Sequence, residues 1–249
     1  MKILEEISKL TKFCSKLIYK VFSIAITTVI LSCLFTACSN PNNSNQNNND
    51  DETMLWTAST INSTGFVDIT YGNGRFVAVE LGGKMAYSLD GITWTLISNN
   101  IFGTGSMWGI GYGDNKFICV GQDKMVYSYD GIAWTAVKNN PFDTNNTPFG
   151  TLIIRDIIYN NDRFIVVGDY GQMAYSYDGI TWTAISDSTF GSSTIWGIAY
   201  GGYKFVAVGQ DGKMAYSYDG ITWTAVNEST FDIRINAIVY GDGRFVAVG

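Results

Sequence analysis

From residue 54 onward, apolar and polar residues alternate in short runs that are separated by glycine-rich turns. One run, which reads KMAYSYDGITWT at residues 213–224, occurs four times and begins at residues 84, 124, 172 and 213. A second run, of the type R/K-F-V-A-V-G, occurs five times, with its phenylalanine at Phe76, Phe117, Phe164, Phe205 and Phe245. An interval of about 40 residues between copies is typical of propellers and repeat arrays.

Each repeat predicts four short strands, which in the fourth copy are 196–200, 205–208, 214–217 and 221–226. Glycine-containing turns between the first two strands, and Asp-Gly between the last two, predict tight two-residue hairpins because glycine adopts positive φ without steric cost. The second strand is apolar on both faces, so we expect each sheet to be covered on both sides. Helical periodicity is not sustained after residue 38, which favours an all-β chain.

The pattern therefore predicts an all-β fold, a β-propeller of four-stranded antiparallel blades. Complete blades are expected at 66–97, 107–137, 153–186 and 195–226, and residues 235–249 give the first two strands of a partial fifth blade. Residues 54–58 match only a fourth strand, which we expect to close the fifth blade from the N-terminal side. Because that blade would lack a third strand, we expect a C-terminal truncation. The alternative is a natural five-bladed ring with one three-stranded blade.

The motif Ser-x-Asp-Gly-x-Thr-Trp within each repeat resembles the Asp-box, or BNR, hairpin of sialidase-like and other bacterial propellers. The copy that begins at Ser128 has Ala133 in place of threonine. The resemblance covers residues 54–249 and implies a propeller, in which the Asp box is a folding device away from the active site. The structural residues that it implies are Asp90, Asp130, Asp178, Asp219, Trp94, Trp134, Trp182 and Trp223.

The N-terminal region has the layout of a secretory signal peptide, with five lysines in residues 1–20 and an uncharged apolar run at 21–37. The residues up to Cys38 resemble the lipobox of bacterial lipoproteins, which implies lipid attachment at Cys38, and the run that ends at Cys33 is a competing match. An uncleaved anchor helix is the alternative, although the run is slightly short for a membrane span.

Residues 39–53 are rich in asparagine and offer no apolar side chain to a core, so they predict a disordered tether. The expected organisation is a signal peptide over 1–38, a tether over 39–53 and a propeller over 54–249. It places the protein in the bacterial cell envelope, attached to the membrane by its N-terminal lipid, at the outer membrane or cell surface if the bacterium has two membranes.

Composition excludes several classes of function. The formal net charge is −6, and residues 38–249 hold 11 basic and 20 acidic residues, which argues against nucleic acid as a partner. The sequence has no histidine, which removes Ser/His and Cys/His nucleophile pairs and most zinc sites. We therefore expect no catalytic residue, no metal and no cofactor. Cys119 stands in a small apolar position of the second strand and should be a buried, inert thiol.

A binding site is best sought where the repeats differ. Four residues before the aromatic that ends each first strand, the copies have Val67, Trp108, Arg155, Trp196 and Asn236. In a propeller this strand lines the central channel, so the last four of these are candidates for binding a glycan or protein ligand at the channel mouth. The alternative is that Trp108 and Trp196 only pack between blades.

These observations favour a monomeric envelope lipoprotein whose propeller is a binding or scaffolding module. One alternative is a sialidase-like hydrolase acting on glycans. That activity would need three arginines around a carboxylate, and only Arg155 and Arg234 lie outside the repeated basic position. Another alternative is an assembly factor for an envelope complex.

Overall fold

The structure is a computed structural model that describes residues 35–38, 56–59, 65–98, 101–103, 105–142, 152–227 and 229–249. Four of its sheets are four-stranded, antiparallel and ordered as in the sequence, and we call them blades 1 to 4. Blade 1 consists of β3 (Phe66–Gly72), β4 (Arg75–Glu80), β5 (Met85–Ser88) and β6 (Thr95–Leu96). Blade 2 consists of β7 (Met107–Gly113), β8 (Lys116–Gly121), β9 (Met125–Ser128) and β10 (Thr135–Ala136). Blade 3 consists of β11 (Ile154–Asn160), β12 (Arg163–Gly168), β13 (Met173–Ser176) and β14 (Thr183–Ala184). Blade 4 consists of β15 (Ile195–Gly201), β16 (Lys204–Gly209), β17 (Met214–Ser217) and β18 (Thr224–Ala225).

Two further sheets have two strands each. The strands β19 (Ala237–Gly241) and β20 (Arg244–Val248) form blade 5, and β1 (Phe35–Cys38) pairs with β2 (Trp56–Ser59). The sequence placed residues 54–58 in blade 5, but among the described strands β2 pairs with β1. In the complete blades the fourth strand pairs with the third, as β18 does with β17, and the described part of blade 5 contains no third strand to hold it.

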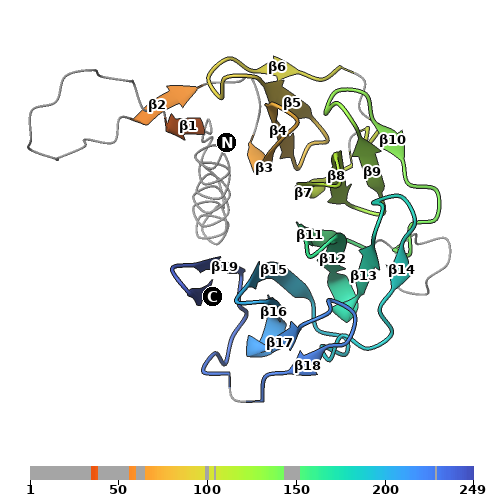
Figure 1. The fold of residues 1–249 in the computed structure, drawn as a ribbon, viewed down its shortest axis with the longest axis vertical. Helices are drawn as coiled ribbons and strands as arrows, with labels where there is room; N and C mark the ends of the chain where they lie inside the picture. Colours follow the sequence, from red (N-terminus) through yellow and green to blue (C-terminus); the bar gives the residue numbers. More distant parts are fainter. Residues whose placement is uncertain are drawn as a thin grey trace, which may run out of the picture.

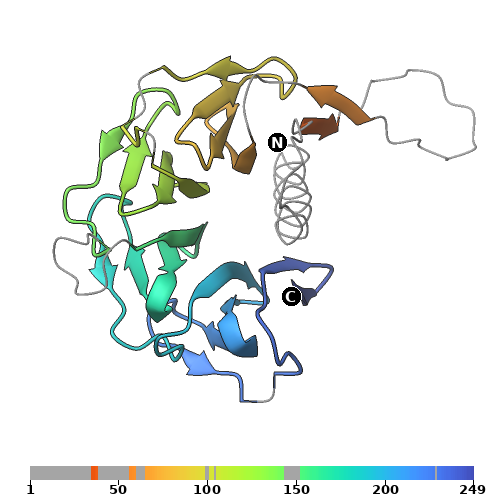
Figure 2. The ribbon, with the colours of Figure 1, turned by 180° about the vertical axis from the view of Figure 1, so that it is seen from behind.

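The blades lie in an arc with their first strands on the inner side (Figure 1), and the view from behind shows the same order (Figure 2). Neighbouring first strands contact one another along this edge, from β3 to β7, β11, β15 and β19. The all-β, four-stranded arrangement agrees with the predicted fold class. No helix in the described part of the chain is long and apolar enough to span a membrane. Most of the predicted signal peptide (1–34) and all of the predicted tether (39–53) lie outside the described residues.

The first two strands of every blade are joined by the predicted two-residue turn. Both turn residues have positive φ in each case, which is the signature of the type I′ turn. The turn pairs are Asn73 and Gly74, Asp114 and Asn115, Asn161 and Asp162, Gly202 and Tyr203, and Asp242 and Gly243.

The connection between the third and fourth strands is not the tight Asp-Gly hairpin that the sequence suggested. In blade 4, residues 218–223 separate β17 from β18, and the Asp219 carboxylate organises this loop. Its Oδ1 accepts hydrogen bonds from the N–H groups of Ile221 and Thr222 and from the Ser217 hydroxyl, at 2.8, 2.7 and 2.9 Å. Asp90, Asp130 and Asp178 make the same contacts in blades 1 to 3. The side chain, rather than a strand ladder, therefore satisfies the backbone of the loop.

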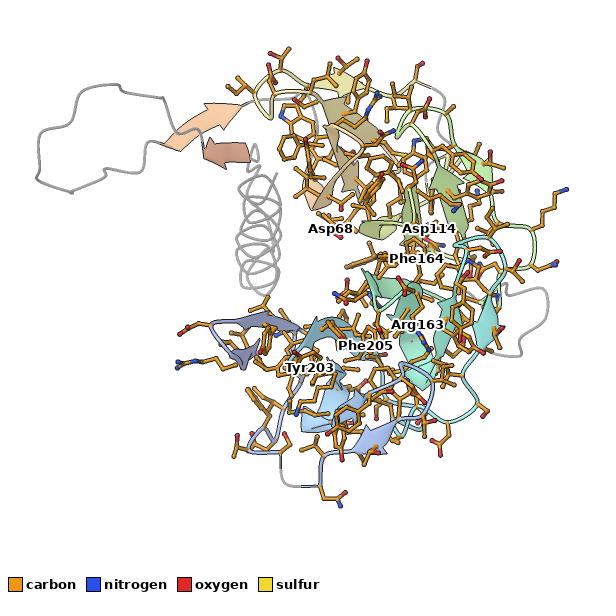
Figure 3. All side chains as sticks on the ribbon, in the orientation of Figure 1. Asp68, Asp114, Arg163, Phe164, Tyr203 and Phe205 are labelled. Atoms are coloured by element: carbon orange, nitrogen blue, oxygen red, sulfur yellow. The ribbon has the colours of Figure 1, made fainter. Side chains whose placement is uncertain are left out.

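The hydrophobic core lies between neighbouring blades. Phe117 and Cys119 of β8 face blade 1, and Ile118 and Val120 of the same strand face blade 3. This arrangement explains why β8 is buried along its whole length. Figure 3 shows the equivalent Phe164 and Phe205 among the side chains of blades 3 and 4.

The predicted structural tryptophans and Cys119 take part in this core. Trp134, Trp182 and Trp223 are buried, whereas Trp94 is half-buried because blade 1 has no preceding blade among the described residues. Cys119 is a free, fully buried thiol whose pKa is raised by burial, in agreement with the expected inert role.

Candidate ligand-binding site at the inner edge of the blades

The variable position singled out from the sequence is a β-bulge in the structure. In each complete blade the pairing of the first two strands skips one residue, for example between Ile154 and Asp156. The skipped residues are Val67, Trp108, Arg155 and Trp196. A bulge turns a side chain away from the regular alternation of the strand, so it can present a side chain that varies between otherwise equal blades.

Three of the candidate side chains stack together at this position. The guanidinium carbon of Arg155, from blade 3, lies 4.7 Å from the ring centroid of Trp108 and 4.3 Å from that of Trp196. The two indoles come from the blades on either side. Arg234, which precedes β19, places its guanidinium carbon 4.7 Å from the Trp196 ring. These distances are within the range of cation–π contacts. We call Trp108, Arg155, Trp196 and Arg234 the cation–aromatic ladder.

Asp169 fixes the central arginine of the ladder. Asp169 begins η2 (Asp169–Gly171), the 3₁₀ turn between β12 and β13, and its Oδ1 accepts from Nε and Nη2 of Arg155, both at 2.9 Å. The two side chains are only 12% and 14% exposed. The guanidinium is thus held by a carboxylate in its plane and by two aromatic rings, so it is rigid and its charge is balanced.

The fourth candidate, Asn236, is not the blade 5 member of the ladder. Asn236 is buried and its backbone N–H donates to the carbonyl of Val248 at 2.7 Å, while Arg234, two residues earlier, reaches Trp196. The paired residues of β19 begin at Ala237, so Asn236 lies just before the strand, and Arg234 precedes Asn236 by two residues. The sequence did single out Arg234 in one respect, because it lies outside the basic position that recurs before the phenylalanine of each second strand.

Two buried aspartates beside the bulges went unnoticed in the sequence. Asp68 and Asp156 follow Val67 and Arg155, and each carboxylate accepts an N–H of the next blade, from Ile110 at 2.9 Å and from Ile198 at 3.1 Å. Asp68 lies at the inner side of blade 1 (Figure 3). The equivalent residues of blades 2 and 4 are glycines, so an alternation of Asp and Gly one position after the bulge was the available signal. These carboxylates join neighbouring blades and position the bulges.

The ladder is suited to contact rather than to chemistry. Arg234 is exposed, and the two indoles and Arg155 are partly exposed, so all four side chains are accessible to a ligand. Within the described ranges, no group of three His, Cys, Asp or Glu side chains is placed to hold a metal ion.

No family profile matches the chain, and no curated protein matches it. Several solved structures do. YCF48 bound to D1 peptide is 18% identical with a TM-score of 0.56, over 72% of this chain and 58% of that chain. A catalytically inactive virginiamycin B lyase from Staphylococcus aureus with quinupristin is 13% identical with a TM-score of 0.65, over 80% and 68%. The WD40 domain of Doa1 is 12% identical with a TM-score of 0.51, over 73% and 61%.

The chain folds as a β-propeller. It spans about three fifths of the length of the two YCF48 structures, the second of which is from Cyanidioschyzon merolae, with 17% identity and 60% coverage. At these identities the likeness concerns the fold, and the propeller predicted from the repeats is confirmed by it.

Proposed function

We propose that this propeller is a binding module of the bacterial cell envelope and that it holds a peptide or glycan against the cation–aromatic ladder. The ladder is the observation that supports the proposal. The blades share the Asp-Gly loop and the second strand, but at the bulge they place two indoles and an arginine side by side, and Arg234 extends the row. Aligned positions at which the repeats differ are where a repeat protein can carry a specific recognition surface.

The chemistry of the ladder fits an extended ligand with polar and apolar parts. The indole edges offer apolar contact, and Arg234 offers donors that can bind a carboxylate or a carbonyl. Because Arg155 is already held by Asp169, little ordering would accompany binding. Since YCF48 was solved bound to D1 peptide, peptides are the first class to test.

The experiment compares two exposed arginines of the same region, Arg234 and Arg244. The mature chain is screened on peptide and glycan arrays, and the affinity for the best ligand is measured by calorimetry. Arg234→Ala should weaken binding by about tenfold, the effect of one lost charge-assisted contact, without a change in melting temperature. Arg244→Ala is the matched control and should leave the affinity unchanged. Equal effects of the two variants would contradict the proposal.

The proposed attachment to the envelope rests on the signal-like N-terminus and the lipobox-like residues before Cys38. Metabolic labelling with palmitate should label the wild-type chain and the Cys33→Ala variant but not the Cys38→Ala variant. Chains that are labelled should be found in the membrane fraction, and chains that are not labelled should be absent from it, because stable anchoring depends on the acyl chains. Labelling that is lost with Cys33→Ala alone would place the lipid at the other cysteine.

A sialidase-type hydrolase is disfavoured by the same geometry. Arg155 is engaged by Asp169, and both Arg155 and Arg234 contact the Trp196 ring. A fluorogenic sialoside should therefore not be cleaved. Cleavage that disappears in an Arg155→Ala variant would replace the binding proposal with an enzymatic one. An assembly role belongs to the binding class, and co-purification from membranes would identify the partner.

A further inference from the structure

Three blades expose a tyrosine at the same place, in the loop between the third and fourth strands. Tyr129, Tyr177 and Tyr218 are 53%, 57% and 65% exposed, although their neighbours on the chain are structural residues of the loop. In blade 1 the position is taken by Leu89, which is 67% exposed. We call these three the outer tyrosines, because the strands that flank them lie on the side of the arc opposite the ladder (Figure 1).

Each outer tyrosine is held in a fixed orientation by a second tyrosine two residues earlier. The pairs Tyr127 with Tyr129, Tyr175 with Tyr177 and Tyr216 with Tyr218 meet edge to face, with ring centroids 5.9, 5.7 and 5.8 Å apart and interplanar angles of 85°, 82° and 79°. This geometry recurs in three consecutive blades. The outer ring therefore presents the same face to solvent each time.

A basic residue of the same blade accompanies each tyrosine pair. Lys116 Nζ lies 5.6 Å from the Tyr129 ring centroid, and the guanidinium carbon of Arg163 lies 5.1 Å from that of Tyr177. In blade 4, Lys204 Nζ lies 5.8 Å from the ring of Tyr216. Each unit thus combines an exposed aromatic ring with hydroxyl and cationic donors beside it.

Two of the loops that carry the outer tyrosines are hydrogen-bonded to the preceding blade. The side-chain amide of Asn73, from blade 1, donates to the carbonyl of Tyr129 at 3.2 Å. Arg163 of blade 3 donates to the carbonyl of Asp219, next to Tyr218. A surface that is ordered before binding loses little conformational entropy when a ligand arrives.

We propose that the outer tyrosines form a second binding surface, separate from the ladder, for a linear polysaccharide. A pyranose ring has an apolar C–H face that stacks on an aromatic ring and a rim of hydroxyls that needs hydrogen-bonding partners, and each unit offers both. Charged side chains accompany these rings, Lys116 at Tyr129 and Arg163 at Tyr177, which distinguishes the surface from the charge-depleted core of a protein interface. The acidic balance of the propeller disfavours nucleic acid. Because the unit recurs blade after blade, a polymer with a repeating unit could engage several copies at once.

The test uses the mature full chain and two defined probes, the hexamers of β-1,4-linked N-acetylglucosamine and of β-1,4-linked glucose, with the dimers as monovalent controls. Calorimetry should show saturable binding of at least one hexamer and about 100-fold weaker binding of its dimer, the gain expected from linked sites. The triple variant Tyr129→Ser, Tyr177→Ser, Tyr218→Ser should lose about 100-fold in affinity for the hexamer. The corresponding triple change to Phe should retain the affinity within about threefold, because the stacking faces remain.

Tyr170→Ser is the matched control, because Tyr170 is an exposed tyrosine, at 43%, in the turn beside Asp169. It should leave hexamer binding and the melting temperature unchanged. If the triple Ser variant fails to fold, Tyr218→Ser alone should still weaken binding by about tenfold. Binding of neither hexamer by the wild-type chain, or full binding by a folded Ser variant, would overturn the proposal. Arg234→Ala should leave hexamer binding unchanged, so the failure of this proposal and the failure of the ladder proposal are distinguishable.

Discussion

Blades 2 to 4 differ from blades 1 and 5 in the burial of the same residues. The phenylalanine of the second strand is fully buried in the middle blades, at Phe117, Phe164 and Phe205, but it is half-buried at Phe76 and Phe245. Val206 of β16 is 6% exposed, and the equivalent Val246 of β20 is 43% exposed. The sequences of these strands are nearly equal, so the difference comes from what covers them, a neighbouring blade and in blade 5 also a third strand, and not from the residue.

The loops and turns behave differently, because their contacts are made within one blade. The aspartate of the loop between the third and fourth strands accepts the same hydrogen bonds in blades 1 and 4. The free energy of unfolding of a repeat protein can thus be written as a sum of two kinds of term: a local term for each repeat and an interface term for each pair of neighbouring repeats. The comparison separates the two terms, and each of the following substitutions changes one of them.

The largest expected effect comes from the interface term. Phe164→Ala removes a fully buried ring between blades 2 and 3 and should lower the free energy of unfolding by about 4 kcal/mol, the usual cost of a buried Phe to Ala change. Phe76→Ala removes a half-buried ring and should cost less than half as much. Urea unfolding followed by tryptophan fluorescence measures both. Equal losses would show that blade 1 is covered as completely as the middle blades.

A second interface effect concerns the close approach of neighbouring first strands. The Cβ of an alanine at Gly113 would overlap the ring of Tyr159 from blade 3, and Tyr112 and Tyr240 lie in the same way over Gly72 and Gly201. Gly113→Ala should therefore cost about 2 kcal/mol, the range of overpacked sites. The position before the turn in blade 3 is Asn160, which already carries a Cβ. Asn160→Ala is the matched control and should cost less than about 1 kcal/mol. An equally large loss there would contradict the steric explanation.

The local features could be predicted from the sequence because they are fixed by residues close together in the chain. Asn, Asp and Gly at the turn before Arg75, Lys116 or Arg163 specify a type I′ hairpin, and the interval between copies specifies the blade. The candidates Trp108, Arg155 and Trp196 were found for the same reason, since they differ at one aligned position.

The remaining features depend on contacts that the sequence pattern does not contain. The bulge that displays Trp108 is a register shift between two strands, and Arg234 reaches Trp196 from the segment before β19, two residues ahead of the aligned position. The carboxylates of Asp68 and Asp156 act across a seam between blades, so their partners are about 42 residues away in the sequence. The loop at Asp219 was read as a tight turn because the motif does not reveal that a side chain replaces the strand ladder.

The Asp219 loop tests the local term, with a smaller effect. Burial raises the pKa of Asp219, but hydrogen bonds from the N–H groups of Ile221 and Thr222 and from Ser217 outweigh it and lower the pKa from 3.8 to about 2. The ionised carboxylate therefore stabilises the fold above about pH 4. This contribution declines as the pH falls from 4 to 2, where the carboxyl is about half protonated in the folded state, and it is lost below pH 2.

Asp219→Ala should lower the free energy of unfolding at pH 7 by about 1 kcal/mol, as for a lost capping side chain. The difference from wild type should shrink below pH 4 and be small by pH 2, where the carboxyl is about half protonated. Asp219→Asn keeps an acceptor and should lose less at pH 7. Urea unfolding across this pH range measures the three chains. A difference that persists at pH 2 would mean that Asp219 acts through packing and not through its charge.

The smallest expected effect has the opposite sign and concerns Tyr203, in the turn of blade 4. Its φ is 62°, a left-handed conformation that costs an aromatic residue about 1 kcal/mol, and its side chain is 86% exposed. The equivalent residues are Gly74, Asn115, Asp162 and Gly243. Tyr203→Asn should therefore raise the free energy of unfolding by about 0.5 kcal/mol, and Asp162→Tyr should lower it by a similar amount.

Thermal unfolding of both variants and of wild type measures these changes. The melting temperature should rise for Tyr203→Asn and fall for Asp162→Tyr. If Tyr203→Asn is stabilising, the strain is local and blade 4 tolerates it because its interfaces with blades 3 and 5 hold the turn in place. Residues held in such conformations gather at functional sites, so the same variant should then be included in the ligand screens. If Tyr203→Asn is destabilising instead, the exposed ring stabilises the turn, and the separation of local and interface terms fails at this position.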